Sequence, residues 1–403
     1  MKKIAGILLG TALLCGIRTI GTSDIPQKNV QAVVCVSNKE IEAAKADGLQ
    51  MRAKASYLID YHSKTVLHAQ NETRHLPIAS MCKIMTLILC FDAIDAGNLS
   101  MDEEISISER AASMGGSQVF LEANAKYPAR ELIKSIVVCS ANDSCVAMAE
   151  RIGGSEGIFV DKMNEKAKEL GASDTLFANC TGLPKEPQYS CAKDVAIMLR
   201  ELLSHEEYYQ FGNVWMEKFN HPKGRYTEIT NTNKLIRFYD GCDGGKTGFT
   251  NEAGFCLAAT AKRNGMRVIS VVIGEENSAN RFEDVRCMFD YAFANYAVTP
   301  IVKENEPLEQ PVYVNGGKTK TVTAFPERSS YAFTKRGEKG NYTTEIRLRE
   351  LKAPLQKGDK VGELLVFKDG VETDRLSLLA ENAVEEAGFF DRFKDIANGW
   401  NAR

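Results

Sequence analysis

The chain has 403 residues, of which 44% are hydrophobic and 26% are charged, and its formal net charge is −3 at pH 7. This length is enough for more than one domain and for a substantial hydrophobic core. Because positive and negative charges nearly balance, the composition argues against a nucleic-acid-binding surface and against a strongly charged partner. Function must therefore come from local groups of residues.

The first residues, MKKIAGILLGTALLCGI, have the pattern of a secretory signal peptide. Lys2 and Lys3 precede an apolar run that is too short to span a bilayer comfortably. The sequence therefore predicts export, with a signal peptide over residues 1–31, and leaves open the cleavage site and an uncleaved anchor. Cys15 follows two leucines, which disfavours a lipidated cysteine.

The 11 cysteines of an exported chain would ordinarily suggest disulfides. Their surroundings argue against this, since neither a CxxC pair nor a histidine-paired metal spacing occurs, and we expect mostly free, buried thiols. Six of them lie in apolar segments: Cys82, Cys90, Cys139, Cys145, Cys256 and Cys287. The five histidines are scattered without ligand spacing, so we expect no metal and no cofactor.

The segment between residues 53 and 295 mixes strand and helix patterns. Residues 56–67 and 254–273 each have the pattern of a hairpin. Helical patterns such as 129–138 and 144–152 lie between them. Strands at both ends with helices between them predict an α+β domain whose sheet unites the two ends.

After residue 298 the pattern changes to short alternating runs with Gly and Pro between them. These runs cover residues 311–314, 318–324, 342–348 and 362–367. They predict a small all-β domain over residues 299–383.

The last residues, GFFDRFKDIANGWNAR, have the pattern of an amphipathic helix. Phe389, Phe393, Ile396 and Trp400 are spaced by three and four, which gives one apolar face. Such a face most commonly docks on the helix's own domain. The terminal position and the aromatic residues favour a helix over residues 384–403 that lies in a membrane surface, although its near-neutral charge adds little attraction to lipid.

The stretch PIASMCKIMT places Ser80 three residues before Lys83. On a helix these residues share a face, so the hydroxyl and the amine can meet. A lysine whose pKa is lowered by burial can accept the proton of a serine nucleophile, and the apolar neighbours Ile78, Met81 and Ile84 supply that burial. Taken alone the pair is a weak signal, since SxxK occurs by chance about once or twice in a chain of this length.

Two further motifs strengthen the signal. Ser140-Ala141-Asn142 follows the apolar residues 136–139, and Lys246-Thr247-Gly248 leads into an apolar strand. SxxK, SxN and KTG in this order form the motif set of penicillin-binding proteins and class A β-lactamases. With the segments 115–122 and 351–354, the chain resembles the D-alanyl-D-alanine carboxypeptidases of the low-molecular-mass penicillin-binding proteins over nearly all of its length.

The resemblance implies a penicillin-binding/β-lactamase-like serine transpeptidase fold over residues 32–298, and an acyl-enzyme mechanism. Ser80 would attack the carbonyl between two D-alanines and Lys83 would take its proton. Ser140 would relay a proton to the leaving amine, while Asn142 would hold Lys83 and the substrate amide. The implied substrate is a peptidoglycan stem peptide, and β-lactams would be covalent inhibitors.

The resemblance also implies a set of substrate-binding residues. Lys246 would add positive potential, Thr247 would bind the terminal carboxylate, and Gly248 would leave room for substrate as an added strand. Backbone N–H groups of the nucleophile and of Phe249 would hold the oxyanion. Arg281 resembles a family arginine near the carboxylate, although a surface salt bridge is the commoner role of a lone arginine.

The chain departs from the family pattern at two places. Ala141 stands where the family more often has glycine. Residues 179–183, NCTGL, replace an expected Asn-Pro-His-Gly-Leu, so any contribution of that histidine is absent. Neither change removes the nucleophile, the base or the relay.

Two alternatives remain beside the carboxypeptidase. A β-lactamase shares the three motifs, but it needs a device for fast deacylation, and no Glu-x-x-Leu-Asn element occurs between Asn142 and Lys246. A catalytically silent wall-binding protein would use the cleft only to hold peptide, and the intact motifs argue against it. The preferred stem peptide, cleavage of cross-links, a vegetative or sporulation role and the oligomeric state stay open.

Overall fold

The computed structural model describes residues 49–304, 306–338 and 340–391. The predicted signal peptide and most of the predicted terminal helix lie outside these residues. No helix within the described ranges is long and apolar enough to cross a membrane.

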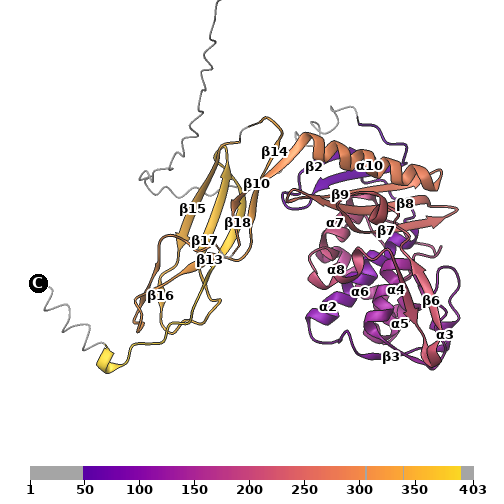
Figure 1. Cartoon of the computed structure of the whole chain (residues 1–403), viewed down its shortest axis with the longest axis horizontal. Coiled ribbons are helices and arrows are strands. Elements are labelled where there is room, and N and C mark those ends of the chain that lie inside the picture. The colour runs from indigo at the N-terminus through magenta and orange to yellow at the C-terminus, as the bar shows by residue number, and fades with distance from the viewer. Residues whose placement is uncertain (1–48, 305, 339, 392–403) are drawn as a thin grey trace, which may run out of the picture. The chain divides into compact units, whose positions relative to one another are not determined.

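The first domain is built on a five-stranded sheet with the strand order β2-β1-β9-β8-β7 (Figure 1). The strands are β1 (Ala55–Asp60), β2 (Val66–Gln70), β7 (Cys242–Thr250), β8 (Gly254–Arg263) and β9 (Met266–Glu275). β1 pairs antiparallel with β9, with Ala55 opposite Ile273. The prediction that one sheet unites the two ends of the segment is therefore confirmed.

The central strand β9 explains why this sheet has helices on both faces. All ten of its residues are buried. Because side chains alternate along a strand, Ile269 and Val271 enter one hydrophobic cluster, while Val268 and Val272 enter another. The second cluster contains Val285, Met288 and Phe289 of the long helix α10, which covers that face of the sheet (Figure 1).

The remaining helices of this domain lie between the two hairpins in the sequence, as predicted. They are α2 (Lys83–Asp95), α3 (Glu109–Ala112), α4 (Ala129–Cys139), α5 (Asn142–Gly153), α6 (Glu156–Glu169), α7 (Ala192–Leu202), α8 (Tyr209–Gly212) and α9 (Leu235–Phe238). The helix α10 (Ser278–Asn295) comes after the second hairpin. Short 3-10 turns cover Ala79–Cys82, Glu206–Tyr208 and Pro222–Gly224. Two small hairpins complete the domain: β3 (Glu104–Ser106) with β4 (Lys126–Pro128), and β5 (Met216–Asn220) with β6 (Tyr226–Thr230).

The second domain is all-β, as predicted. Its strands are β10 (Tyr296–Val302), β11 (Val312–Asn315), β12 (Thr321–Val322), β13 (Ala324–Pro326), β14 (Ser330–Lys335), β15 (Tyr342–Leu348), β16 (Leu351–Lys352), β17 (Lys360–Lys368) and β18 (Val371–Ala380). They form the sheets β10-β14, β12-β11-β16 and β13-β18-β17-β15. Inward-facing residues such as Leu364, Leu376 and Leu378 make a separate hydrophobic core.

Two details of the structure differ from the sequence-based predictions. Val384 is buried and bridged to Leu355, and helical geometry begins only at Phe389, so residue 384 is too early a start for the terminal helix. The nine described cysteines are free and seven of them are buried, but Cys287 is exposed. Its neighbours Val285 and Met288 face the sheet, and on a helix Cys287 then points away from it.

Candidate active site

The centre of the site is the turn that carries Ser80. A 3-10 turn over Ala79–Cys82 leads directly into α2, which begins at Lys83. The side chain of Lys83 is buried, and its Nζ lies 3.0 Å from Oγ of Ser80, 2.7 Å from Oδ1 of Asn142 and 2.6 Å from the carbonyl oxygen of Thr181. The predicted meeting of the serine hydroxyl and the lysine amine is therefore seen in the structure.

The three contacts of Lys83 suit both protonation states of its amine. As an ammonium, Lys83 donates to all three oxygens. As a neutral amine, it keeps two N–H donors for Asn142 and Thr181, and its lone pair is free to accept the proton of Ser80. The surroundings of Lys83 can thus hold the amine in place before and after it takes up a proton.

Ser140 lies at the carboxyl end of α4, next to this group. It has a left-handed backbone with φ of 65° and caps the helix. Its Oγ is buried and has no hydrogen-bond partner among the described residues. A buried hydroxyl without a partner is costly, so this orientation leaves Ser140 available to a bound molecule.

Residues 115–121 fix the SxN segment from outside the motif. Asn142 donates from Nδ2 to the carbonyl oxygen of Gly115 at 2.7 Å. The buried carboxyl group of Asp143 accepts the backbone N–H groups of Val119 and Leu121, both at 3.1 Å. These bonds orient the amide of Asn142, so that its Oδ1 faces Lys83.

Lys246 and Thr247 are consecutive residues of β7, which is one of the two edge strands of the sheet. Lys246 is buried, and its Nζ donates to the carbonyl oxygen of Thr247 at 3.2 Å. Burial, together with the nearby charge of Lys83, lowers the pKa of Lys246 to about 7. Thr247 donates from Oγ1 to Oγ1 of Thr232 at 2.7 Å.

Gly248 also has a structural role. A Cβ at this position would lie 2.6 Å from the carbonyl oxygen of Ile78, which belongs to the nucleophile turn. The missing side chain lets β7 approach Ser80 closely. Phe249 follows, half exposed and stacked on Phe255 with 4.3 Å between the ring centroids.

Arg281 lies in α10 and is buried behind β7. Its Nη1 donates to the carbonyl oxygen of Gly248 at 3.3 Å, and its Nη2 donates to Oγ of Ser278 at 3.3 Å. It forms no salt bridge with the described residues, which separates it from an ordinary surface arginine. Burial lowers the pKa of Arg281 to about 10.

The loop that follows α6 contributes residues that sequence reasoning missed. Thr181 supplies a carbonyl oxygen to Lys83, and Gly182 has φ of 80° and packs against the backbone of Ala79. Asn179 holds this turn, because its Oδ1 accepts the N–H groups of Thr181 and Gly182 at 3.1 and 2.7 Å. The Asn and Gly of the NCTGL segment were the available signal for such a turn.

Among the residues that the structure describes, two groups of side chains have the ligand types of a metal site. In the first, Asp92, Glu201 and His205, the ammonium of Lys166 already lies 3.0 Å from Asp92 and 3.4 Å from Glu201. The second contains Asp174, Cys191 and Asp194, where Asp194 accepts the backbone N–H of Asp174 at 2.7 Å. Both groups are occupied by the protein's own donors.

A serine paired with a buried lysine, an SxN turn and a KTG edge strand together define the class of serine penicillin-interacting enzymes. The chain matches the D-alanyl-D-alanine carboxypeptidase family over residues 40–277, and the penicillin-binding protein 5 C-terminal domain over residues 296–386. It therefore belongs to the D-alanyl-D-alanine carboxypeptidase family. The resemblance inferred from the motifs is confirmed, and so is the predicted fold class.

Individual relatives match nearly the whole chain. The D-alanyl-D-alanine carboxypeptidase DacF of Bacillus subtilis is 41% identical over 364 residues, which are 89% of this chain and 93% of that protein. DacC of Escherichia coli is 31% identical over 89% of this chain and 90% of its own length. Among solved structures, penicillin-binding protein 5 of Haemophilus influenzae superposes with a TM-score of 0.64 at 28% identity, covering 84% of this chain and 98% of that one.

Proposed function

We propose that this protein is a serine-type D-Ala-D-Ala carboxypeptidase, which removes the terminal D-alanine from peptidoglycan stem peptides and is inhibited by β-lactams. The observation that carries the proposal is the buried amine of Lys83, 3.0 Å from Oγ of Ser80. Family membership and the carboxypeptidase names of the relatives support the same activity. Cell-wall synthesis and cell shape are the processes in which such an enzyme takes part.

Acylation follows from these contacts. Oγ of Ser80 attacks the carbonyl carbon of the penultimate D-alanine, and its proton passes to Nζ of Lys83. Ser140 relays that proton from Lys83 to the leaving amine as the C–N bond breaks, which releases D-alanine and leaves an ester on Ser80. A water molecule then attacks this ester, frees the hydroxyl of Ser80 and releases the shortened peptide as a carboxylate.

The residues of β7 and α10 position the substrate. Thr247 binds the terminal carboxylate, and the buried cations Lys246 and Arg281 favour an anion there. The backbone N–H groups of Ser80 and Phe249 receive the oxyanion. Because β7 is an edge strand, the peptide can add to it as a further strand.

Intact-mass measurement after incubation with benzylpenicillin tests the proposal. The wild type is expected to gain one stable adduct, a Ser80→Ala variant none, and the wild type is expected to release D-alanine from a Lys-D-Ala-D-Ala peptide. An adduct that decays with penicillin turnover and without D-alanine release would show a β-lactamase instead. If no adduct forms at all, the result would indicate a catalytically silent binding protein.

We propose further that the chain is exported and attaches to the outer face of the cytoplasmic membrane through its last residues. The lysine-led apolar run at the N-terminus supports export. Phe389 and Phe390 are 79% and 84% exposed, which suits side chains that enter a lipid interface. Sedimentation with lipid vesicles tests attachment: the full chain should pellet, and a chain ending at Ala387 should stay in solution.

A further inference from the structure

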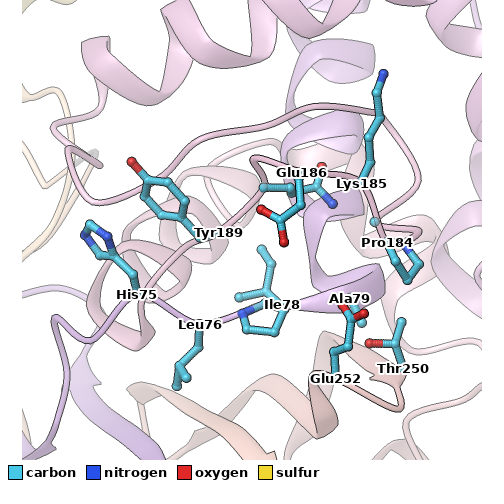
Figure 2. Close-up of a pocket in the computed structure, with 13 residues that line it drawn as sticks. His75, Leu76, Ile78, Ala79, Pro184, Lys185, Glu186, Tyr189, Thr250 and Glu252 are labelled. Carbon is cyan, nitrogen blue, oxygen red and sulfur yellow. The ribbon is translucent and has the colours of Figure 1, made fainter.

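A cavity of about 210 Å³ lies beside the nucleophile turn, and Glu186 and Glu252 are among the residues that line it (Figure 2). It is part of the site around Ser80. None of residues 115–122, which fix the SxN segment, lines this cavity. That loop is held instead by a hydrogen-bonded group centred on His221, which takes no part in the steps of acylation.

His221 directly follows β5, and its side chain is buried. Nδ1 of the ring lies 2.8 Å from Nη2 of Arg225 and 3.0 Å from Oη of Tyr127, and Nε2 lies 2.9 Å from Oγ1 of Thr227. A guanidinium group has donors and no acceptor, so Nδ1 must offer it a lone pair. The contacts therefore require a neutral His221 with its proton on Nε2.

The three partners of His221 also hydrogen-bond to the backbone of residues 119–122. The pairs are Thr227 with the carbonyl oxygen of Val119 at 3.3 Å, Arg225 with that of Phe120 at 2.9 Å, and Tyr127 with the N–H group of Glu122 at 3.3 Å. Phe120 needs such support, because its φ of 64° is a strained conformation for a residue with a side chain. One neutral imidazole thus holds the groups that fix this part of the loop.

The same loop orients Asn142 of the SxN motif. The carbonyl oxygens of Gly115 and Ser117 accept from Nδ2 and from the backbone N–H group of Asn142, both at 2.7 Å. Oδ1 of Asn142 in turn accepts from Nζ of Lys83 at 2.7 Å. A change at His221 can therefore reach the catalytic lysine through the loop.

The charges that face His221 decide how it responds to pH. Burial and the guanidinium group of Arg225 lower the pKa of His221, while the carboxylate of Glu122 acts in the opposite direction. Burial raises the pKa of Tyr127, which therefore stays a neutral phenol, and burial also raises the pKa of Asp143, which bonds to the same loop. Protonation of His221 would remove the lone pair of Nδ1 and place a second cation beside Arg225.

We propose that His221 is a pH-sensitive positioning residue, whose neutral form holds the loop 115–122 against Asn142 and whose protonation releases the loop and slows acylation of Ser80. The proposal rests on the proposed carboxypeptidase function and adds regulation of that site by acidic pH. Arg225 cannot donate to Nδ1 once this atom carries a proton, so the geometry itself couples the hold on the loop to the charge of the ring.

The test measures the rate of acylation by benzylpenicillin between pH 4.5 and pH 8 for the wild type and a His221→Gln variant. The amide of glutamine can accept from Arg225 and donate to Thr227, but it does not titrate. The two rates should agree within about threefold at pH 7.5, as for a conservative replacement. Neutral histidine falls about tenfold per pH unit below its pKa, so by pH 4.5 the wild type should lose about three- to tenfold more than the variant. Asp143 is present in both proteins, so the ratio of the two rates isolates His221.

A His68→Gln variant is the matched control. His68 is also buried and burial also lowers its pKa, but its Nε2 bonds to Oγ of Ser56 on β1 at 2.8 Å. It should follow the wild-type profile. A His221→Ala variant, which keeps none of the ring's bonds, should acylate about tenfold more slowly at pH 7.5, and glutamine should restore the rate.

Parallel pH profiles of the wild type and His221→Gln would overturn the positioning role, and so would a His221→Ala variant that acylates at the wild-type rate. In both cases the adduct on the wild type would uphold the proposed function. No adduct on the wild type at any pH would overturn both proposals.

Discussion

The carbonyl oxygen of Thr181 lies 2.6 Å from Nζ of Lys83, although the two residues are 98 positions apart in the chain. The backbone makes this contact, so it can form with many different side chains at position 181. This contact makes the NCTGL loop part of the site, even though the histidine expected at this position is absent.

Replacing Thr181 by alanine should therefore have little effect on acylation. The carbonyl contact to Lys83 remains. The variant loses the hydrogen bond that Oγ1 of Thr181 donates to Oδ1 of Asn179 and the longer one, at 3.4 Å, that it accepts from the backbone N–H of Leu183. We expect an acylation rate by benzylpenicillin within about threefold of the wild type, and a loss of about 1 kcal/mol in the free energy of unfolding. Stopped-flow acylation and denaturant unfolding measure the two; a hundredfold slower acylation would show that the side chain itself acts.

Replacing Gly182 by alanine should disrupt the site. The new Cβ would lie 2.0 Å from the carbonyl oxygen of Ala79, beside the nucleophile, and φ is 80°. Gly171→Ala is the control, because Gly171 has φ of 77° with no atom within 4 Å. Both variants carry a backbone penalty of about 1–2 kcal/mol, and overpacking adds about 1–3 kcal/mol for Gly182→Ala alone. Gly182→Ala should therefore label more slowly with penicillin and have a lower free energy of unfolding than Gly171→Ala. Equal labelling rates and equal stabilities would contradict the close packing of Gly182 against Ala79.

An Asn142→Asp variant should acylate slowly, and it also loses the hydrogen bond from Nδ2 to the carbonyl oxygen of Gly115. Oδ1 of Asn142 accepts from Lys83 at 2.7 Å, and a carboxylate there would hold the proton on the amine. Because general-base catalysis contributes about 10²–10⁴-fold, we expect acylation to fall at least about a hundredfold. The rate of benzylpenicillin labelling checks this, with thermal unfolding as the control for folding. Labelling near the wild-type rate would argue against Lys83 as the base.

The low pKa of Lys246 predicts a pH dependence of stability. Burial lowers this pKa from 10.5 to about 7, so between these values the unfolded chain binds a proton that the folded protein does not. Folding stability should therefore rise with pH in this window, by on the order of 1 kcal/mol per pH unit. The measurement is the free energy of unfolding by denaturant, for the wild type and for Lys246→Met, at pH 7 and at pH 9. The difference between the two proteins at each pH isolates the effect of Lys246. A difference independent of pH would contradict the lowered pKa.

The sequence by itself determined the main elements and the identity of the reacting groups. The short, nearly continuous apolar runs 254–261 and 266–273, separated by the turn residues Arg263-Asn264-Gly265, become β8 and β9. Ser80 and Lys83 meet because their spacing of three is local to one turn. Ser140 and Asn142 could be identified from their motif, because the residue type determines the chemistry of the side chain.

Only the tertiary structure decided which distant parts complete the site. The contact from the carbonyl of Thr181 could not be predicted from the sequence, because every residue has a backbone carbonyl group. Gly248 faces the turn at Ile78, Arg281 lies buried behind β7, and Glu186 lies across a cavity from Glu252. Each relation joins segments far apart in the chain, and their distance is fixed by packing of the sheet and the loop, which no local periodicity encodes.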